Sequence, residues 1–493
     1  MRKGSRIIVL LVWVVLLGLL FGRDYLVEDL QLWETAALER GRETSFAGVY
    51  FRDERIGFVR SRLVAEAEDE VLLEQEAYLL LNILGEQHPV RMRLSASLDA
   101  SLLLRDFSFV LISPFAETGV QGRVEGRDLL LELDTPRGVR QERIRLRDAP
   151  RIATNRRDYL LSPDLTPGGR VRVNYFDPVS LAGQERVLEY RGRDRVVIHG
   201  RIHNLHQFSE TFAGMRINVW LDDEGRMVKE ESPAGFVFLA EPEFRATDIP
   251  RAGPEILTSV AVPLIGRLPA DLARRDRMTY RLELAADAGL DPAEDLDLAG
   301  GRQSLEGDIL QVSRQPWPPP AGAGPCSPEG PAAAAIRAAL SATPHVQSDD
   351  PELIALARQI TAGAASPPEA MARLADWVYA GLEKRPVLGI PDALSVLATR
   401  VGDCNEHAAL FAGLARAIGL PTRIAAGLVF QDETFFYHAW NEVCLADQWY
   451  SVDTTLNELP AGLTHIRLVT GETAEMVRLG ALLGKLRIAV ATD

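Results

Sequence analysis

Positive charge and cysteine are both scarce in this sequence of 493 residues. Asp and Glu (69) outnumber Lys and Arg (54), which gives a formal net charge of −15. Nucleic-acid binding needs a basic patch that displaces counterions from phosphates, so this balance argues against a nucleic-acid partner. The three cysteines, Cys326, Cys404 and Cys444, are irregularly spaced. They make no disulfide framework and no CxxC metal pattern, and at least one of them must stay unpaired.

One uninterrupted apolar run, at 7–21, follows three cations within the first six residues. Such a run indicates a signal peptide or a short signal anchor. Because no small-x-small cleavage site follows it, residues 1–23 are interpreted as a transmembrane helix in the cytoplasmic membrane. The cations place the N-terminus in the cytoplasm, so the bulk of this single-pass chain is expected to be extracytoplasmic, in the periplasm. Residues 24–43 have apolar positions at helical spacing and predict a stalk helix.

Residues 44–312 show short alternating segments separated by turn residues, which is typical of an antiparallel β-rich domain. A break near residue 250 could divide it into two subdomains. Many strands with few helices predict a large curved sheet or half-barrel. Its apolar residues could bind a lipid or an extended peptide, or they could simply be the core of a spacer. Residues 313–345 are rich in Pro and Gly and predict a linker, in which Cys326 is interpreted as an incidental cysteine.

Three histidines in the β-rich part, His199, His203 and His206, have a spacing that resembles a metal site. On a strand, however, side chains alternate between the two faces, so His206 would point away from the other two. No cysteine or evident carboxylate joins them. The sequence therefore predicts neither a metal nor another cofactor.

Residues 346–493 begin with helical patterns, and apolar residues at 404–418 recur on one face, which predicts a buried helix that starts at Cys404. A cysteine in the first turn of a helix lies beside unpaired N–H groups and the positive end of the helix dipole. Both favour thiolate over thiol, as a nucleophile requires. For an isolated cysteine, a buried structural role would be the simpler interpretation.

The strands that follow supply partners for this cysteine. The patterns at 423–430 and 435–445 predict two strands, and a short turn leads to a third segment at 449–454. Pairing across that turn sets His438 roughly opposite Asp453, and a suitable register puts both on one face. A thiol, a base and a carboxylate that orients the base are the groups needed for thiol-based acyl transfer.

Four blocks of this region are Gly402-Asp403-Cys404-Asn405-Glu406-His407-Ala408-Ala409-Leu410, Ala415-Arg416-Ala417-Ile418-Gly419-Leu420-Pro421-Thr422-Arg423, His438-Ala439-Trp440-Asn441-Glu442-Val443 and Trp449-Tyr450-Ser451-Val452-Asp453-Thr454-Thr455. In order, spacing and flanking residues they resemble the transglutaminase-like superfamily. The resemblance covers roughly 350–458 and implies a papain-like α+β core, with Cys404 as nucleophile, His438 as general base and acid, and Asp453 as orienting group. Thr454 departs from the family, which usually has proline there; the change could loosen the strand end but leaves the carboxylate in place.

Other polar residues near these blocks have supporting interpretations. His407, one helical turn after Cys404, is interpreted as structural and not as a metal ligand. Glu406 and Glu442 could supply hydrogen bonds to the site, and Trp440 is expected to wall it. The backbone N–H of Cys404 is the candidate donor to an oxyanion.

The whole sequence thus predicts a multidomain protein with an N-terminal transmembrane helix, a large antiparallel β-rich middle domain and a C-terminal α+β transglutaminase-like domain. The expected function is that of a membrane-anchored extracytoplasmic thiol enzyme. It would be a cysteine peptidase, amidase or acyltransferase that acts on amide bonds of protein or peptide substrates, with hydrolysis favoured over cross-linking. The alternatives are a non-catalytic envelope scaffold or binding protein that uses the β-rich domain, and a lipid or lipoprotein carrier built on a concave sheet. An intact set of thiol, imidazole and carboxylate counts against a scaffold.

Overall fold

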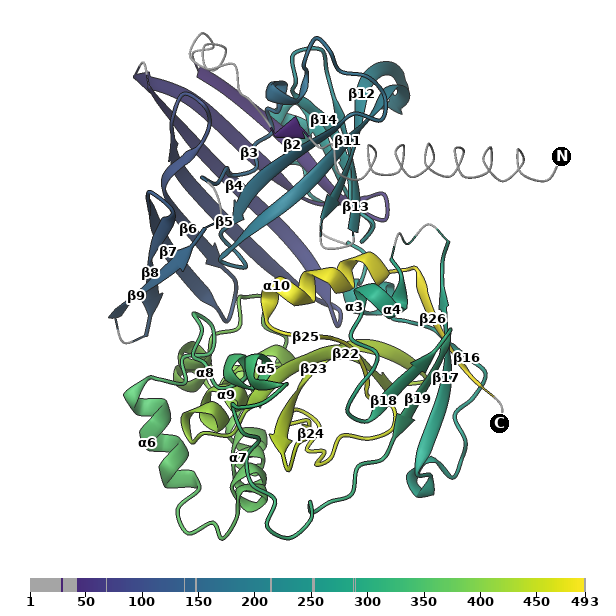
Figure 1. Ribbon diagram of the computed structural model, residues 1–493. Coiled ribbons are helices and arrows are strands. Elements are labelled where there is room, and N and C mark those ends of the chain that lie inside the picture. Colours follow the sequence, from purple (N-terminus) through teal and green to yellow (C-terminus); the bar gives the residue numbers. More distant parts are fainter. Residues whose placement is uncertain are drawn as a thin grey trace, which may run out of the picture.

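The computed structural model of the chain describes residues 28–29, 42–67, 69–136, 138–146, 149–212, 215–250, 253–286, 288 and 290–491. Figure 1 shows two lobes, one built of long strands and one built of helices and smaller sheets. The segment that contains α10 (Thr473–Met476) lies between the two lobes (Figure 1).

The predicted membrane-spanning helix is not part of this architecture. Across the described residues, no helix has both the length and the apolar character needed to cross a membrane. The apolar run at 7–21 lies outside those residues, as does most of the predicted stalk. Glu28–Asp29, expected in the stalk helix, instead form strand β1, which pairs in parallel with β10 (Arg170–Asp177). The fold class is therefore corrected to a large β-rich region followed by an α+β domain.

Within the described part of the chain, one fifteen-stranded sheet forms the first lobe. Apart from β1, neighbouring strands run antiparallel. After β1 and β10, the sheet order is β11 (Ala182–Ile198), β12 (Arg201–Phe212), β13 (Met215–Leu221), β14 (Met227–Glu231), β15 (Phe236–Glu241), β2 (Arg42–Phe51), β3 (Glu54–Ala67), β4 (Glu70–Ile83), β5 (Glu86–Leu98), β6 (Leu104–Ile112), β7 (Glu117–Glu125), β8 (Asp128–Thr135) and β9 (Gly138–Arg145).

Alternation along each strand explains why this sheet forms. In β8, Leu129, Leu131 and Leu133 are buried, whereas Glu132 between them is exposed. Side chains of a strand point to opposite faces in turn, so one face of the sheet gathers the apolar residues into a core. The β-rich character predicted for this region is confirmed.

A second sheet joins the middle of the chain to its C-terminal part. Its order is β16 (Leu264–Ile265), β26 (Leu486–Val490), β17 (Arg277–Leu284), β19 (Ile309–Ser313) and β18 (Gln303–Glu306). Its strands β16 and β17 lie within the region 44–312 that is predicted to be β-rich, but they pair with the last strand, β26, and not with the long-stranded sheet. Short helices α2 (Glu243–Ala246) and α3 (Ile256–Val260) connect the two sheets, and α4 (Pro292–Asp295) lies between β17 and β18 of the second sheet.

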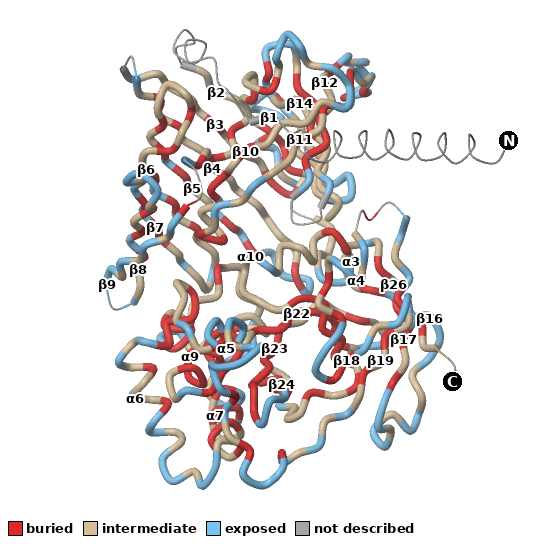
Figure 2. Tube along the Cα trace, in the orientation of Figure 1, coloured by how far each residue is buried: buried red, intermediate tan, exposed pale blue. Residues whose placement is uncertain are grey.

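The α+β unit packs helices against a four-stranded sheet. The sheet order is β24 (Gln448–Val452), β23 (Thr434–Leu445), β22 (Thr422–Gln431) and β25 (Ile466–Thr470). The helices are α5 (Ala333–Ala338), α6 (Pro351–Ile360), α7 (Pro367–Gly381), α8 (Ala393–Thr399) and α9 (Cys404–Ala417), and β20 (Glu383–Lys384) pairs with β21 (Val401–Gly402). Leu410 and Phe411 of α9 are fully buried in one core with Val443 of β23. Buried segments, red in Figure 2, follow α9, β22 and β23.

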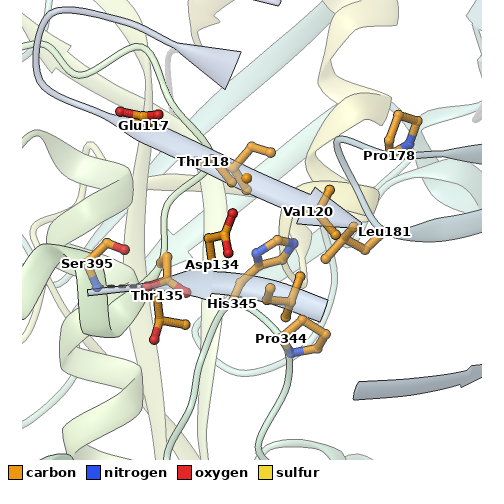
Figure 3. A pocket seen from close by; sticks show the side chains of 14 residues that line it. Glu117, Thr118, Val120, Asp134, Thr135, Pro178, Leu181, Pro344, His345 and Ser395 are labelled. Carbon is orange, nitrogen blue, oxygen red and sulfur yellow. Dashed lines mark hydrogen bonds between the residues drawn. The ribbon is translucent and has the colours of Figure 1, made fainter. Parts of the chain in front are cut away.

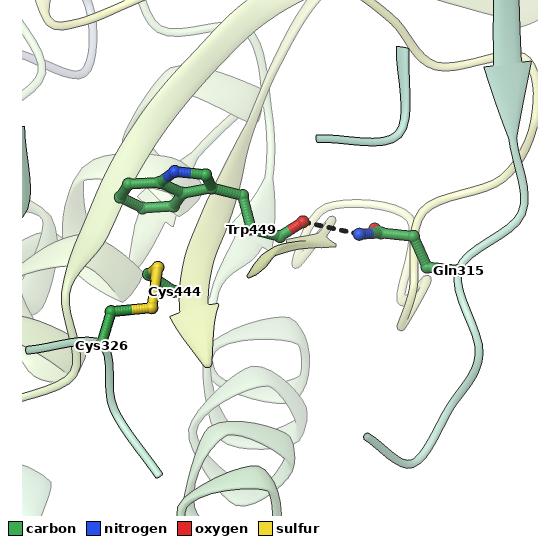
Figure 4. The surroundings of a disulfide bond; sticks show 4 residues. All are labelled: Gln315, Cys326, Cys444 and Trp449. Carbon is green, nitrogen blue, oxygen red and sulfur yellow. Dashed lines mark hydrogen bonds between the residues drawn. A yellow bond between two sulfur atoms is a disulfide. The ribbon is translucent and has the colours of Figure 1, made fainter. Parts of the chain in front are cut away.

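Residues 313–345, predicted as a linker, lie against this unit. Gln315 accepts the N–H of Ser451 at 2.9 Å and donates to the carbonyl of Trp449. Cys326 forms a disulfide bond with Cys444 of β23, 118 residues further along the chain (Figure 4). The interpretation of Cys326 as an incidental cysteine is therefore wrong, because the pairing depends on a tertiary contact that spacing does not reveal.

A loop before α8 connects the two lobes. Ile390 belongs to the apolar core of the long-stranded sheet, and Leu388 packs against that core. The guanidinium of Arg385 lies 5.5 Å from the ring centroid of Phe115, which precedes β7. The β-rich lobe therefore contacts the chain segment that leads to Cys404.

Candidate active site

Cys404 is the first residue of α9, and a capping box fixes where this helix begins. The carboxylate of Asp403 accepts a backbone N–H of the first turn at 3.2 Å, and the side chain of Glu406 accepts the N–H of Asp403 at 3.0 Å. A Cβ added at Gly402 would lie 2.2 Å from the Cβ of Glu406, so only glycine fits there. These residues place Cys404 in the first turn, as the sequence predicts.

The thiol of Cys404 lies against strand β23. Its sulfur accepts a hydrogen bond from the backbone of Ala439, the residue after His438. Burial raises the pKa of the Cys404 thiol well above its usual value, and the charge of Asp403 adds to this. The expectation that the helix N-terminus lowers this pKa is therefore wrong, because loss of hydration outweighs the helix dipole.

His438 and Asp453 come together at the end of the predicted hairpin. β23 and β24 are joined by a two-residue turn, Ala446–Asp447, in which φ is 49° and 58°. The paired region ends with Asn441 opposite Val452, so Asp453 lies directly beyond it and reaches His438 diagonally. Nε2 of His438 lies 2.7 Å from Oδ2 of Asp453. Nδ1 is then the ring nitrogen that remains for the thiol.

Four donors surround the carboxylate of Asp453. Oδ1 accepts the N–H groups of Thr455 at 2.8 Å and Leu456 at 3.0 Å. Oδ2 accepts Nε2–H of His438 and, at 2.8 Å, Nε2–H of His465. Burial opposes ionisation, but the hydrogen bonds from the two imidazoles outweigh it and hold the pKa of Asp453 far below its usual range. The carboxylate is therefore an anion with a fixed orientation.

His465 is a residue of this site that sequence reasoning missed. It immediately precedes β25, and its side chain is fully buried. Its ring meets Trp440 edge-on at 5.2 Å, and Trp440 in turn stacks on His438 at 6.3 Å between ring centroids. The loop before β25 has no periodic pattern that places His465, and a lone histidine 12 residues after Asp453 was the only hint.

The other polar residues singled out from the sequence have separate roles. Nδ1 of His407 donates to a backbone carbonyl one turn earlier, at 2.6 Å. Glu406 belongs to the capping box, and burial raises its pKa to about 9. Glu442 is paired with Arg423 of β22 at 2.6 Å and with Arg467 of β25 at 3.0 Å, so it ties β23 to these two strands and not to the triad.

His199 and His206 of the β-rich lobe do not share a site. Nε2 of His199 lies 2.9 Å from the carboxylate of Glu241. Nδ1 of His206 is hydrogen-bonded to the hydroxyl of Tyr190 at 2.9 Å. Each of these two histidines therefore has its own partner.

His438, Asp453 and His465 are the one group of potential metal ligands in the described part of the chain, with their candidate ligand atoms within 4.8 Å of one another. Both Nε2 atoms lie at hydrogen-bond distance from the same oxygen of Asp453. A metal ion between them would displace both hydrogen bonds and occupy the nitrogen that orients His438. The geometry is therefore that of two imidazole N–H donors that share one carboxylate oxygen of Asp453 as their acceptor.

A cavity of about 430 Å³, partly open to solvent, lies between the lobes and is lined from β7, β8 and the segment around the start of α8 (Figure 3). Its lining includes the carboxylates of Glu117, Asp134 and Asp392. It also includes the buried His345, whose Nε2 has no hydrogen-bond partner among the described residues. Cys404 and its partners do not line this cavity.

A helix-borne thiol packed against a strand whose histidine is hydrogen-bonded to an aspartate supports assignment to the thiol enzymes. Residues 354–454 match the family model of the transglutaminase-like superfamily. The match runs from α6 to the residue after Asp453 and so includes Cys404 and His438. The chain therefore carries a transglutaminase-like domain.

Several solved structures are similar to parts of the chain. A putative cysteine protease from Cytophaga hutchinsonii has 16% identity and a TM-score of 0.29, over 44% of this chain and 86% of that one. A β-barrel-like protein of a domain of unknown function from Brucella abortus has 12% identity and a TM-score of 0.31, over 41% and 94%. A putative protease from Parabacteroides distasonis has 11% identity and a TM-score of 0.20, over 71% and 69%. None of the curated proteins matches this chain.

Proposed function

We propose that the protein is a thiol enzyme that cleaves amide bonds of protein or peptide substrates through Cys404, His438 and Asp453. The observation that carries this proposal is the 2.7 Å contact between Nε2 of His438 and the anionic Asp453. This contact leaves Nδ1 of the His438 ring free to accept a proton. The sulfur of Cys404 accepts a hydrogen bond from the backbone N–H of Ala439, the residue after His438.

In the proposed reaction, Nδ1 of His438 takes the proton of the Cys404 thiol as the sulfur attacks the amide carbonyl carbon. The new C–S bond gives a tetrahedral oxyanion, for which the N–H of Cys404 is the proposed donor. That N–H belongs to the first turn of α9 and has no partner within the helix. Collapse breaks the C–N bond, and the proton on His438 leaves with the amine.

The acyl group then sits on Cys404 as a thioester. Attack by water, with its proton passing to His438, releases a carboxylic acid and restores the thiol. Attack by an amine would instead form a new amide and cross-link two chains. We propose hydrolysis as the main outcome, with a peptidase or amidase activity.

The raised thiol pKa gives the reaction a specific requirement. Because burial favours the neutral thiol, thiolate forms only when the proton is transferred to a base within the site. General-base catalysis typically contributes about 10²-fold to 10⁴-fold in rate. Reactivity of Cys404 near neutral pH should therefore depend steeply on His438.

We further propose that the domain works in an oxidising, extracytoplasmic compartment. The disulfide between Cys326 and Cys444 supports this, because structural disulfides persist outside the reducing cytosol. The same bond leaves Cys404 as the free cysteine of the chain.

The raised pKa of the thiol also favours a second candidate, a non-catalytic envelope protein that binds a partner through its β-rich lobe and keeps the partly exposed Cys404 as a structural residue. A thiol whose pKa is raised by burial is what an inert core cysteine would show. The two candidates differ in whether His438 controls the thiol.

Alkylation of the native, oxidised protein with iodoacetamide separates them, because label can enter only at Cys404. The rate is measured from pH 5 to pH 10 for wild type, His438→Ala and Asp453→Asn. We expect His438→Ala to lower the rate near pH 7 by at least about tenfold. His345→Leu is the matched control, since it replaces a buried histidine that belongs to the cavity between the lobes.

Glutamine-containing peptides then identify which molecule accepts the acyl group from Cys404. Ammonia release, peptide cleavage and incorporation of a fluorescent amine are measured side by side. Equal alkylation rates for wild type and His438→Ala over the whole pH range would exclude the catalytic proposal and support the binding protein. Amine incorporation exceeding hydrolysis would overturn the choice of acceptor alone.

A further inference from the structure

Assuming the proposed function, we infer that His465 is a positioning residue of the site, which holds the carboxylate of Asp453 so that His438 keeps its productive orientation. His465 lies outside the matched residues 354–454, and its contact with the triad arises from the loop that leads into β25.

The hydrogen bonds of Asp453 show why a second imidazole matters. A carboxylate offers about four lone-pair positions, and here each oxygen accepts two donors. Two of those donors are backbone groups that cannot follow a rotating side chain. His465 fills the remaining position on Oδ2, so this oxygen cannot turn away from His438 without losing a bond.

Packing keeps His465 itself in place. Its side chain is fully buried, and its ring lies edge-on to Trp440 and 5.9 Å from the ring centroid of His438. Trp440, only 2% exposed, stacks on the ring of His438. His438, Trp440 and His465 thus form one packed group around Asp453.

The proton positions follow from the acceptor. A carboxylate oxygen can only accept, so Nε2 of His465 carries a hydrogen. Burial lowers the pKa of His465, which favours the neutral ring, although Asp453 and Glu458 act in the opposite direction. Nδ1 of His465 has no hydrogen-bond partner among the described residues, and the carboxylate of Glu458 stands 3.7 Å away. His465 therefore contributes a fixed dipole to Asp453 without adding a second cation beside His438.

Two effects follow for catalysis. With His465 in place, His438 donates from Nε2 and presents Nδ1 to the thiol. Without it, Oδ2 can rotate or bind water, and His438 spends less time in the reactive orientation. The loss of a donor also leaves the negative charge of Asp453 less neutralised, which stabilises the imidazolium that forms during the reaction and moves the acid limb of the pH–rate profile to higher pH.

The test compares His465→Leu, which removes the donor, with His465→Gln, whose amide N–H can still reach toward Asp453. The alkylation rate of Cys404 by iodoacetamide is measured from pH 5 to pH 10 on the full-length oxidised protein. Peptide kinetics supply kcat and KM separately. Circular dichroism and the thermal midpoint establish that each variant is folded, and His345→Leu is again the matched control.

We expect His465→Leu to lower the alkylation rate near pH 7, and kcat, by about tenfold to 100-fold, with KM changed less than threefold. The acid limb of its pH–rate profile should move up by about 0.5 to 1 pH unit. His465→Gln should recover most of the rate and of the profile. His345→Leu should leave both unchanged.

The proposal is overturned if folded His465→Leu keeps the wild-type rate and pH profile, or if His465→Gln is as impaired as His465→Leu. If His465→Leu does not fold, proton NMR of His465→Gln tests the proposal instead. The hydrogen-bonded Nε2–H resonance of His438 must persist in that variant, and its loss would overturn the proposal. The proposal would also be overturned if a chelator abolished the wild-type rate and added zinc restored it, because these residues would then be metal ligands. A normal rate in His438→Ala would mean that the proposed function fails, whatever His465 does.

Discussion

Replacing Glu406 by glutamine tests the electrostatics at the start of α9. Glu406 is 3% exposed, and burial, followed by repulsion from Asp403, raises its pKa to about 9. A glutamate in an unfolded chain titrates near about 4.3. Between these two values the folded state holds a proton that the unfolded state has released, so the free energy of unfolding falls as pH rises. Glu406→Gln, which is neutral at every pH, should remove that fall.

The size of the effect follows from proton linkage. One proton held only by the folded state changes the free energy of unfolding by about 1.4 kcal/mol per pH unit. From pH 5 to pH 8 the upper value is about 4 kcal/mol, and relaxation around the neighbouring Asp403 lowers it. We therefore expect wild type to lose about 1 to 4 kcal/mol more than Glu406→Gln over this interval.

Urea unfolding at pH 5 and pH 8, followed by tryptophan fluorescence, measures this difference. Glu475→Gln is the matched control, because Glu475 has the same place in the capping box of α10 but is exposed. If the free energies of unfolding of wild type and Glu406→Gln fell equally between pH 5 and pH 8, a protonated Glu406 would be refuted. An infrared difference spectrum of these two proteins at pH 7 without a protonated carboxyl band would refute it independently.

Two further predictions concern stability. Cys326→Ser removes the cross-link to Cys444 and should lower the free energy of unfolding of the oxidised protein by about 2 to 4 kcal/mol, whereas an unchanged urea midpoint would contradict a stabilising disulfide. Arg467→Met deprives Glu442 of a cation that is 1% exposed and should cost about 3 kcal/mol, at the lower end of the usual range because Arg423 still pairs with Glu442. Adding Glu442→Gln to Arg467→Met should recover part of that loss, and a further loss of the same size would count against the buried pair.

The helix and the hairpin of the site could be predicted because their signals are local. A helix at 404–418 was expected, and α9 spans Cys404–Ala417; a strand at 435–445 was expected, and β23 spans Thr434–Leu445. Apolar periodicity, the capping residue and a two-residue turn act within a few positions of the chain. The contact of His438 with Asp453 follows from that hairpin almost directly.

Contacts that join distant parts of the chain could not be predicted in the same way. Cys326 and Cys444 are 118 residues apart, and β26 enters a sheet with strands some two hundred residues earlier. No spacing rule connects such segments. The predicted direction of the Cys404 pKa shift is wrong for a related reason. The start of the helix is visible in the sequence, but the burial that outweighs the helix dipole depends on how β23 packs against the thiol.

Two buried carboxyl groups near the thiol show how the same fold treats like groups differently. Glu406 is 3% exposed and Asp453 is 1% exposed, so burial penalises the charge of both. Glu406 has an acid as its neighbour, and its pKa rises to about 9. Asp453 has four N–H donors, two of them imidazoles, and its pKa falls. The donors, and not the depth of burial, therefore decide which carboxyl is an anion. A neutral Glu406 keeps a negative charge away from the sulfur, and an anionic Asp453 is positioned to stabilise the imidazolium that forms when His438 takes the thiol proton.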